Sequence, residues 1–134
     1  MKTFVYFIIA LLASSCLKTG NNTYYISTTA RAEITHTDIP DTATVNLVTS
    51  IKAWAEEPNG CWSNLNFILT KNNDFDYSLE AFGRYESTGT CPEIKVYGDT
   101  TIAFKPASSG IYKFHVTKSQ DEIVTDTMVV ADEI

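Results

Sequence analysis

Three cysteines carry the most specific chemistry in this 134-residue sequence, and their number is odd. Cys16 directly follows an apolar run, whereas Cys61 and Cys91 lie in the later part of the chain. If Cys16 is modified, the other two remain as an even pair, and an oxidising compartment favours a disulfide between them. No Cys-x-x-Cys occurs, and neither His36 nor His115 has metal-ligand spacing to a cysteine. We therefore expect a structural Cys61–Cys91 disulfide, with free thiols as the alternative.

Motifs that support catalysis are missing from the sequence. It contains no nucleophile elbow, glycine-rich phosphate loop or His-Glu metal motif. His36 and His115 lie far apart, and no acidic partner is fixed by spacing to either. Residues 72–76 place oxygen ligands at alternate positions, like part of a calcium loop, but the glycine and the distant glutamate are absent. The sequence thus predicts no catalytic residue, no bound metal and no cofactor.

Two tryptophans are the candidate binding residues. Strict alternation in residues 50–56 puts Trp54 on the polar face of a strand, and Trp62 follows a turn next to Cys61. Exposed tryptophan stacks on sugars or anchors a protein partner. The alternative is that Trp54 merely covers the outer sheet, or that the register differs by one residue and the ring packs inward.

The N-terminus has the pattern of a secretory signal peptide. Lys2 precedes the ten-residue apolar run FVYFIIALLA, and small residues follow it. Ten helical residues span about 15 Å, half of a ~30 Å hydrocarbon core, so the run is too short for a membrane span. A buried N-terminal helix or strand is the alternative. We expect residues 1–15 to be removed by cleavage between Ser15 and Cys16.

The segment Leu12–Cys16 resembles a bacterial lipobox, in which the cysteine after the cut receives lipid. Ala13 stands where leucine is usual, and the Ser-Ser-Cys ending is similar to lipoproteins of the Bacteroidetes. This resemblance implies lipid attachment at Cys16 and export to the outer membrane, on its periplasmic face or on the cell surface. An ordinary signal peptidase would cut the same bond. Two acyl chains give stable membrane attachment, whereas one is marginal.

Three triplets resemble the O-glycosylation acceptor pattern of exported Bacteroidetes proteins: residues 41–43, 99–101 and 126–128. The resemblance implies glycosylation at Thr42, Thr100 or Thr127. The alternative is structural, because aspartate favours turns and threonine favours strands, so Asp-Thr often begins a strand.

These residues need a β-rich framework to position them. The chain is 44% hydrophobic with a net charge of −6, which disfavours nucleic-acid binding. No helical period persists, and short β-rich runs alternate with turns, which predicts seven to nine strands in an antiparallel sandwich or barrel. The runs cover residues 31–37, 42–48, 50–56, 62–70, 75–85, 93–97, 100–105, 111–118 and 122–131.

Residues 106–118 resemble the tyrosine corner that leads into the sixth strand of immunoglobulin-like domains, with Tyr112 as the tyrosine. That family often has a cysteine two places later, where this chain has Phe114. The resemblance implies an all-β, immunoglobulin-like sandwich over residues 31–134, after a tether of residues 16–30. A lipocalin-like barrel is the competing fold.

Together these features predict a lipid-anchored, non-catalytic binding or accessory module. It would attach to a membrane through its lipid and meet an envelope protein or a glycan. A small-ligand carrier with a lipocalin-like barrel is the alternative, and an enzyme is the third.

Overall fold

A computed structural model describes residues 24–119 and 121–134 of the chain. The predicted signal peptide, residues 1–15, and the predicted lipid attachment at Cys16 lie outside the described residues.

The described residues form an all-β fold without helices, and the strands match the predicted runs closely. Alternating apolar residues favour strands here because each strand buries one face only. The nine strands are β1 (Ile26–Ala32), β2 (Ile34–Asp38), β3 (Thr42–Thr44), β4 (Thr49–Glu57), β5 (Trp62–Lys71), β6 (Asp76–Ser87), β7 (Val96–Phe104), β8 (Gly110–Thr117) and β9 (Ile123–Ala131).

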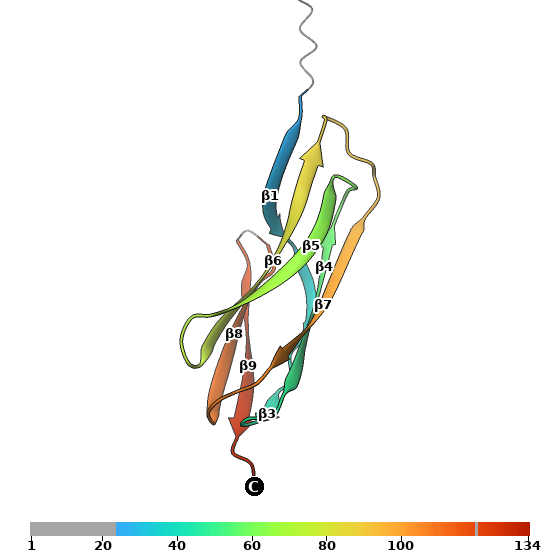
Figure 1. Cartoon of the computed structure of the whole chain (residues 1–134). Helices are drawn as coiled ribbons and strands as arrows, with labels where there is room; N and C mark the ends of the chain where they lie inside the picture. Colours follow the sequence, from blue (N-terminus) through green and yellow to red (C-terminus); the bar gives the residue numbers. More distant parts are fainter. Residues whose placement is uncertain (1–23, 120) are drawn as a thin grey trace, which may run out of the picture.

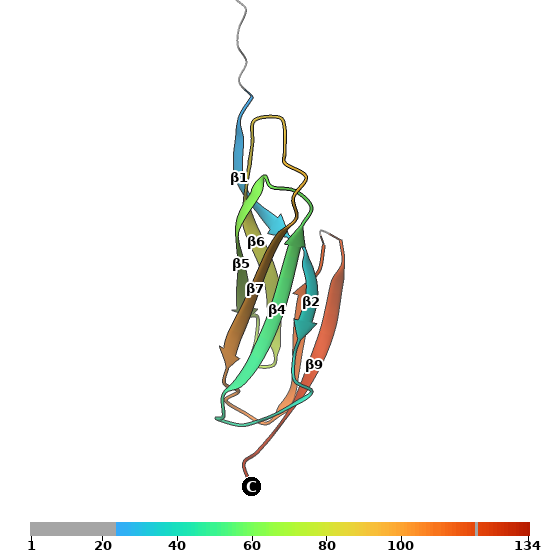
Figure 2. The same cartoon turned by 90° about the vertical axis from the view of Figure 1, so that its right-hand side faces the viewer.

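The strands lie in two sheets that do not close into a barrel (Figures 1 and 2). The larger sheet has the order β1-β6-β8-β9-β3, with β5 also paired to β6, and the smaller sheet has the order β2-β4-β7. A two-sheet sandwich is therefore correct at this level, and the lipocalin-like barrel is wrong for the described chain.

The prediction of a wholly antiparallel arrangement is wrong for two strand pairs. β6 runs parallel to β8, and β3 runs parallel to β9. Parallel neighbours need a crossover instead of a hairpin, and the chain provides one between β6 and β8 by passing through β7 of the other sheet. β3 and β9 are neighbours in space but lie far apart in the sequence, so no hairpin fixes their relative direction.

Four strand boundaries differ from the sequence prediction. The expected strand 42–48 is shortened to β3, and the residues that follow it form a turn, in which Asn46 has a φ of 64°. Residues 26–30, expected in the tether, already pair with β6 as the first part of β1. The expected strand 31–37 is divided at Glu33, because buried Ala32 ends β1 and buried Ile34 begins β2 of the other sheet. The expected strands 93–97 and 100–105 join into a single β7, which passes through Gly98 without a turn.

The core lies between the sheets and follows the predicted alternation. Tyr112, Phe114 and Val116 of β8 are buried. Ile51, Ala53 and Ala55 of β4 face them from the smaller sheet, also buried. On β5 the inward residues are only partly buried but pack against this core: Leu65, Phe67 and Leu69. Continuous packing of this kind leaves the outer faces of the sheets as the surfaces for contact with other molecules.

Tyr112 makes the hydrogen bonds of a tyrosine corner. Its Oη donates to the backbone carbonyl of Ser108 at 2.9 Å and accepts from the Ser108 backbone N–H at 3.3 Å. The side chain is only 2% exposed. The turn before β8 is thus fixed to the strand that follows it.

Candidate binding surfaces

Trp54 lies on the outer face of the smaller sheet, as the alternation in its strand predicted. Its side chain is 37% exposed, while its strand neighbours Ala53 and Ala55 point into the core. Directly opposite on β2, His36 places its ring 5.0 Å from the tryptophan ring, centroid to centroid. The two rings form a continuous exposed aromatic surface across two strands.

Polar residues and a third aromatic ring extend this surface across β7. Asp99 lies opposite Trp54, Thr101 lies opposite Lys52, and Tyr97 is 69% exposed one row away. We call the outer face formed by His36, Lys52, Trp54, Tyr97, Asp99 and Thr101 the Trp54 face. Its strands β2 and β7 are both edges of the three-stranded sheet. Surfaces that contact proteins and glycans typically combine aromatic rings with hydrogen-bonding groups around them.

Trp62 has a different environment, because it faces inward at the start of β5. It packs against the core and makes an edge-to-face contact with Tyr85 at 5.4 Å between ring centroids. Its ring also lines a hollow of about 230 Å³ beside Arg31 and Glu57. The contacts of Trp62 are therefore mainly structural, with one edge reaching the hollow.

Glu57 is a buried carboxylate in the wall of this hollow, and no local sequence pattern indicated it. The side chain is 7% exposed, and it accepts a hydrogen bond from the Glu33 backbone N–H at 2.7 Å. Burial raises the pKa of this carboxyl above its usual value, while the backbone hydrogen bond opposes that rise. The same bond fixes the crossing between β1 and β2, so Glu57 has a structural task that accounts for its position.

Cys61 and Cys91 form a disulfide in the structure, the pair that the cysteine count predicted. Cys61 is buried immediately before β5, and Cys91 lies in the connection between β6 and β7. The bond ties that connection to the start of β5, next to Trp62. It leaves no thiol on either residue for redox chemistry or metal binding.

The three candidate glycosylation residues have different exposures. Thr42 and Thr127 are exposed, on β3 and β9. Thr100 is half-buried, and it lies opposite buried Ala53 on the inward side of β7. Since opposite residues of an antiparallel pair point to the same face, the Thr100 side chain points inward and is less accessible to a modifying enzyme than those of Thr42 and Thr127. Thr42 and Thr127 are accordingly the two candidates to keep.

His115 has an acidic partner that sequence spacing did not reveal. Its Nε2 lies 3.1 Å from Asp76 Oδ1, and its Nδ1 lies 2.9 Å from Thr125 Oγ1. Hydrogen bonds from Asn73 and then from His115 hold the pKa of the Asp76 carboxyl below its usual value. Asp76, His115 and Thr125 follow one another in the order of the side chains of an acyl-transfer triad. These three side chains, however, lie on the outer face of the larger sheet, where they join β6, β8 and β9. Parallel pairing of β6 with β8 brought them together.

The turn at residues 72–76 is a hydrogen-bonded hairpin turn. Asn73 Oδ1 accepts from the Phe75 backbone N–H, and Asn73 Nδ2 donates to Asp76. In the part of the chain that the structure describes, no group of three or more histidine, cysteine, aspartate or glutamate side chains is arranged to hold a metal ion.

A search of the described residues for membrane-spanning helices finds none that is long and apolar enough. Comparison of the chain with protein-family models, with curated proteins and with solved structures gives no match.

Proposed function

We propose that this protein is a lipid-anchored envelope protein whose single immunoglobulin-like sandwich is a non-catalytic binding module. In this proposal residues 1–15 direct export, Cys16 carries the lipid, and the Trp54 face contacts an envelope protein or a glycan. The tyrosine corner at Tyr112 supports the immunoglobulin-like assignment, because it is a characteristic feature of those sandwiches. The parallel β6–β8 pair makes the strand order unusual for such a domain.

The exposed pair of rings at Trp54 and His36 is the observation that carries the binding role. A tryptophan is costly to leave in water, and burial of such a ring in an interface contributes up to several kcal/mol of binding free energy. The surrounding charges have both signs, with Lys52 beside Asp99. This mixture favours a neutral or mixed partner surface over a strongly charged one. The net charge of −6 likewise disfavours a nucleic acid as the partner.

Site-specific photo-crosslinking in native membranes tests the proposal. A photoreactive residue in place of Tyr97 should crosslink a defined partner, and adding Trp54→Ala should reduce the crosslinked product about tenfold or more. The same photoreactive residue in place of Ile111, which is 60% exposed on the other sheet, is the matched control and should not give that product. Cys16→Ala should release the protein from the membrane fraction and reduce the product as well.

Two results would contradict the proposal. If Trp54→Ala keeps its fold by circular dichroism and retains every crosslink, the Trp54 face is not the contact surface. If Cys16→Ala remains in the membrane fraction and the intact mass shows no acyl chain, the lipid anchor is wrong.

A further inference from the structure

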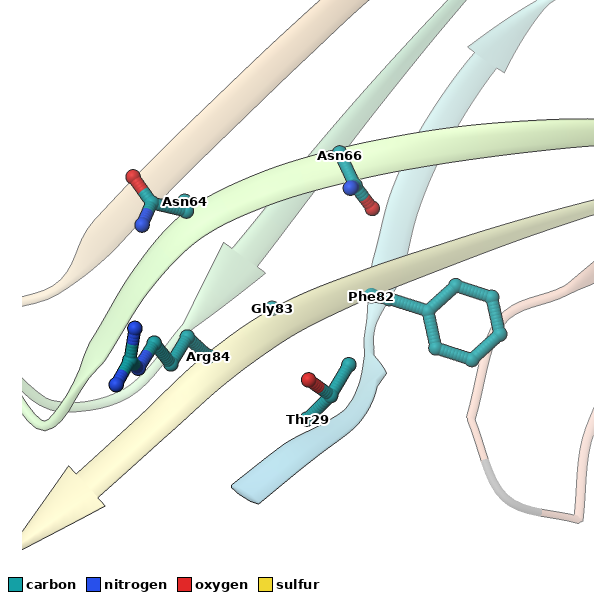
Figure 3. Close-up of a pocket in the computed structure, with 6 residues that line it drawn as sticks. All are labelled: Thr29, Asn64, Asn66, Phe82, Gly83 and Arg84. Carbon is teal, nitrogen blue, oxygen red and sulfur yellow. The ribbon is translucent and has the colours of Figure 1, made fainter. Parts of the chain in front are cut away.

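A second, smaller site lies on the other sheet, where β1, β5 and β6 run side by side (Figure 3). It is an open hollow of about 150 Å³ on the outer face of the larger sheet. The residues around it come from all three strands, with Gly83 of β6 between the others: Thr29, Asn64, Asn66, Phe82, Gly83 and Arg84. It shares no residue with the Trp54 face.

A bulge in β5 shapes the hollow and presents two asparagines to it. The pairing of β5 with β6 shifts register between Ser63 and Asn66, and the backbone of Asn64 lies in the left-handed region, with a φ of 52°. Asparagine is one of the few residues that adopt this conformation readily. A bulge redirects side chains and is often found beside a functional site. Here it brings both Asn64 and Asn66, which are exposed, to one wall of the hollow.

The two asparagine amides are free to bind a ligand. Among the described residues, the asparagine side chains that make hydrogen bonds within the protein are those of Asn59, Asn72 and Asn73. Each amide of Asn64 and Asn66 therefore offers one acceptor oxygen and two N–H donors. Such a pair can bridge neighbouring hydroxyl groups, which also donate and accept.

The charges around the hollow are already compensated. Arg84 Nη2 lies 2.7 Å from Glu86 Oε1, and Arg31 Nη2, beside the hollow, lies 2.6 Å from Glu80 Oε1. A guanidinium has five N–H donors, so Arg84 retains donors after binding Glu86. Half-buried Phe82 supplies an apolar wall. The hollow thus combines hydrogen-bonding groups and one aromatic ring without a free charge.

We propose that this hollow binds one neutral sugar ring, either as a free monosaccharide or as a residue of a glycan. Its volume corresponds to about five water molecules at ~30 Å³ each, and it is well below the ~300–1,000 Å³ of sites for drug-sized ligands. The asparagine amides hydrogen-bond sugar hydroxyls, and the Phe82 ring contacts the C–H face. The inference goes beyond the proposed function and does not depend on the Trp54 face.

Titration of the full, ¹⁵N-labelled chain with glucose, galactose, mannose and N-acetylglucosamine tests this site. We expect at least one of these sugars to shift the side-chain amide signals of Asn64 and Asn66, with a dissociation constant of about 1 mM. Asn66→Ala and Asn64→Gly should each weaken binding about tenfold. Glycine accepts the left-handed backbone at position 64, so Asn64→Gly removes the amide without straining the bulge. Thr70→Ala, at the far end of the exposed face of β5, is the matched control and should bind as the native chain does.

The outcomes separate clearly. The site is refuted if none of the four sugars shifts the two amides, or if both asparagine variants bind as tightly as the native chain. It is also refuted if glucuronate or glucosamine, the charged counterparts, binds more tightly than the neutral sugars. If Asn66→Ala fails to fold, the amide shifts of the native chain and Asn64→Gly still decide. A panel of oligosaccharides then distinguishes a free monosaccharide from a terminal or internal glycan residue.

Discussion

The hydroxyl of Tyr112 is predicted to contribute substantially to the stability of the sandwich. Tyr112→Phe removes one oxygen that donates to the Ser108 carbonyl and accepts from the Ser108 N–H. The ring contacts stay, because phenylalanine fills the same place beside Phe75 and Phe104. The variant therefore isolates the two hydrogen bonds of the corner from its hydrophobic packing.

The expected loss follows from these two hydrogen bonds. Each intramolecular hydrogen bond contributes about 0.5–1.5 kcal/mol net, so the free energy of unfolding should fall by about 1–3 kcal/mol. For a domain of about 110 residues, the number that the structure describes, each kcal/mol lowers the melting temperature by roughly 4 °C. The melting temperature should accordingly fall by about 4–12 °C.

Urea unfolding followed by tryptophan fluorescence measures this loss. The midpoint should decrease while the slope of the free energy against urea stays unchanged, since the variant and the native chain expose the same amount of surface on unfolding. Tyr97→Phe is the matched control: its side chain is 69% exposed, and it should leave the midpoint within experimental error. If Tyr112→Phe changes the stability no more than Tyr97→Phe does, the corner does not stabilise the domain.

Three further predictions concern other parts of the fold. Replacing Cys61 and Cys91 by serine should cost about 3.6 kcal/mol in the chain-entropy model, because the bond spans 30 residues; equal melting temperatures with and without reductant would contradict it. Gly98→Ala should lower the free energy of unfolding by about 1–3 kcal/mol, since its Cβ would lie 2.7 Å from the Cβ of Leu65. Chemical unfolding that matches that of the native chain would contradict this prediction. Because the folded state lowers the pKa of Asp76, its charged form stabilises the fold at pH values above its ordinary pKa of 3.8, and this stabilisation disappears as the pH falls through the lower folded-state pKa. The difference in stability between the native chain and Asp76→Asn should therefore shrink over that acidic range. A difference that does not depend on pH would refute the reasoning.

Local pattern predicted most of the strands, because period-2 alternation directly marks a strand with one buried face. It failed at Glu33 and Gly98 for identifiable reasons. The chain changes sheets at Glu33 without a turn residue, since the carboxylate of Glu57 holds the Glu33 backbone N–H at the crossing. Gly98 looked like a turn, but it is a packing position: the side chain of Leu65 fills the space where a Cβ would point.

Local sequence also predicted some features of the candidate binding residues, whereas strand pairing decided the others. Exposure of Trp54 followed from its own strand, because neighbours in sequence fix which face a side chain occupies. The ring of His36 beside it depends on the register between β2 and β4, which no local pattern specifies. The hollow at Asn64 and Asn66 depends on a bulge and on three strands, so the sequence showed two asparagines but no site.

The sequence by itself determined the strand content, the inward faces, the tyrosine corner and the cysteine pair, because each of these is encoded in residue type and short-range spacing. Only the tertiary structure decided which strands are neighbours. The parallel pairing of β6 with β8 joins Asp76 to His115, and the pairing of β1, β5 and β6 creates the hollow. Strand pairing depends on contacts between residues far apart in the chain, whose free energy is gained only when the whole sandwich assembles.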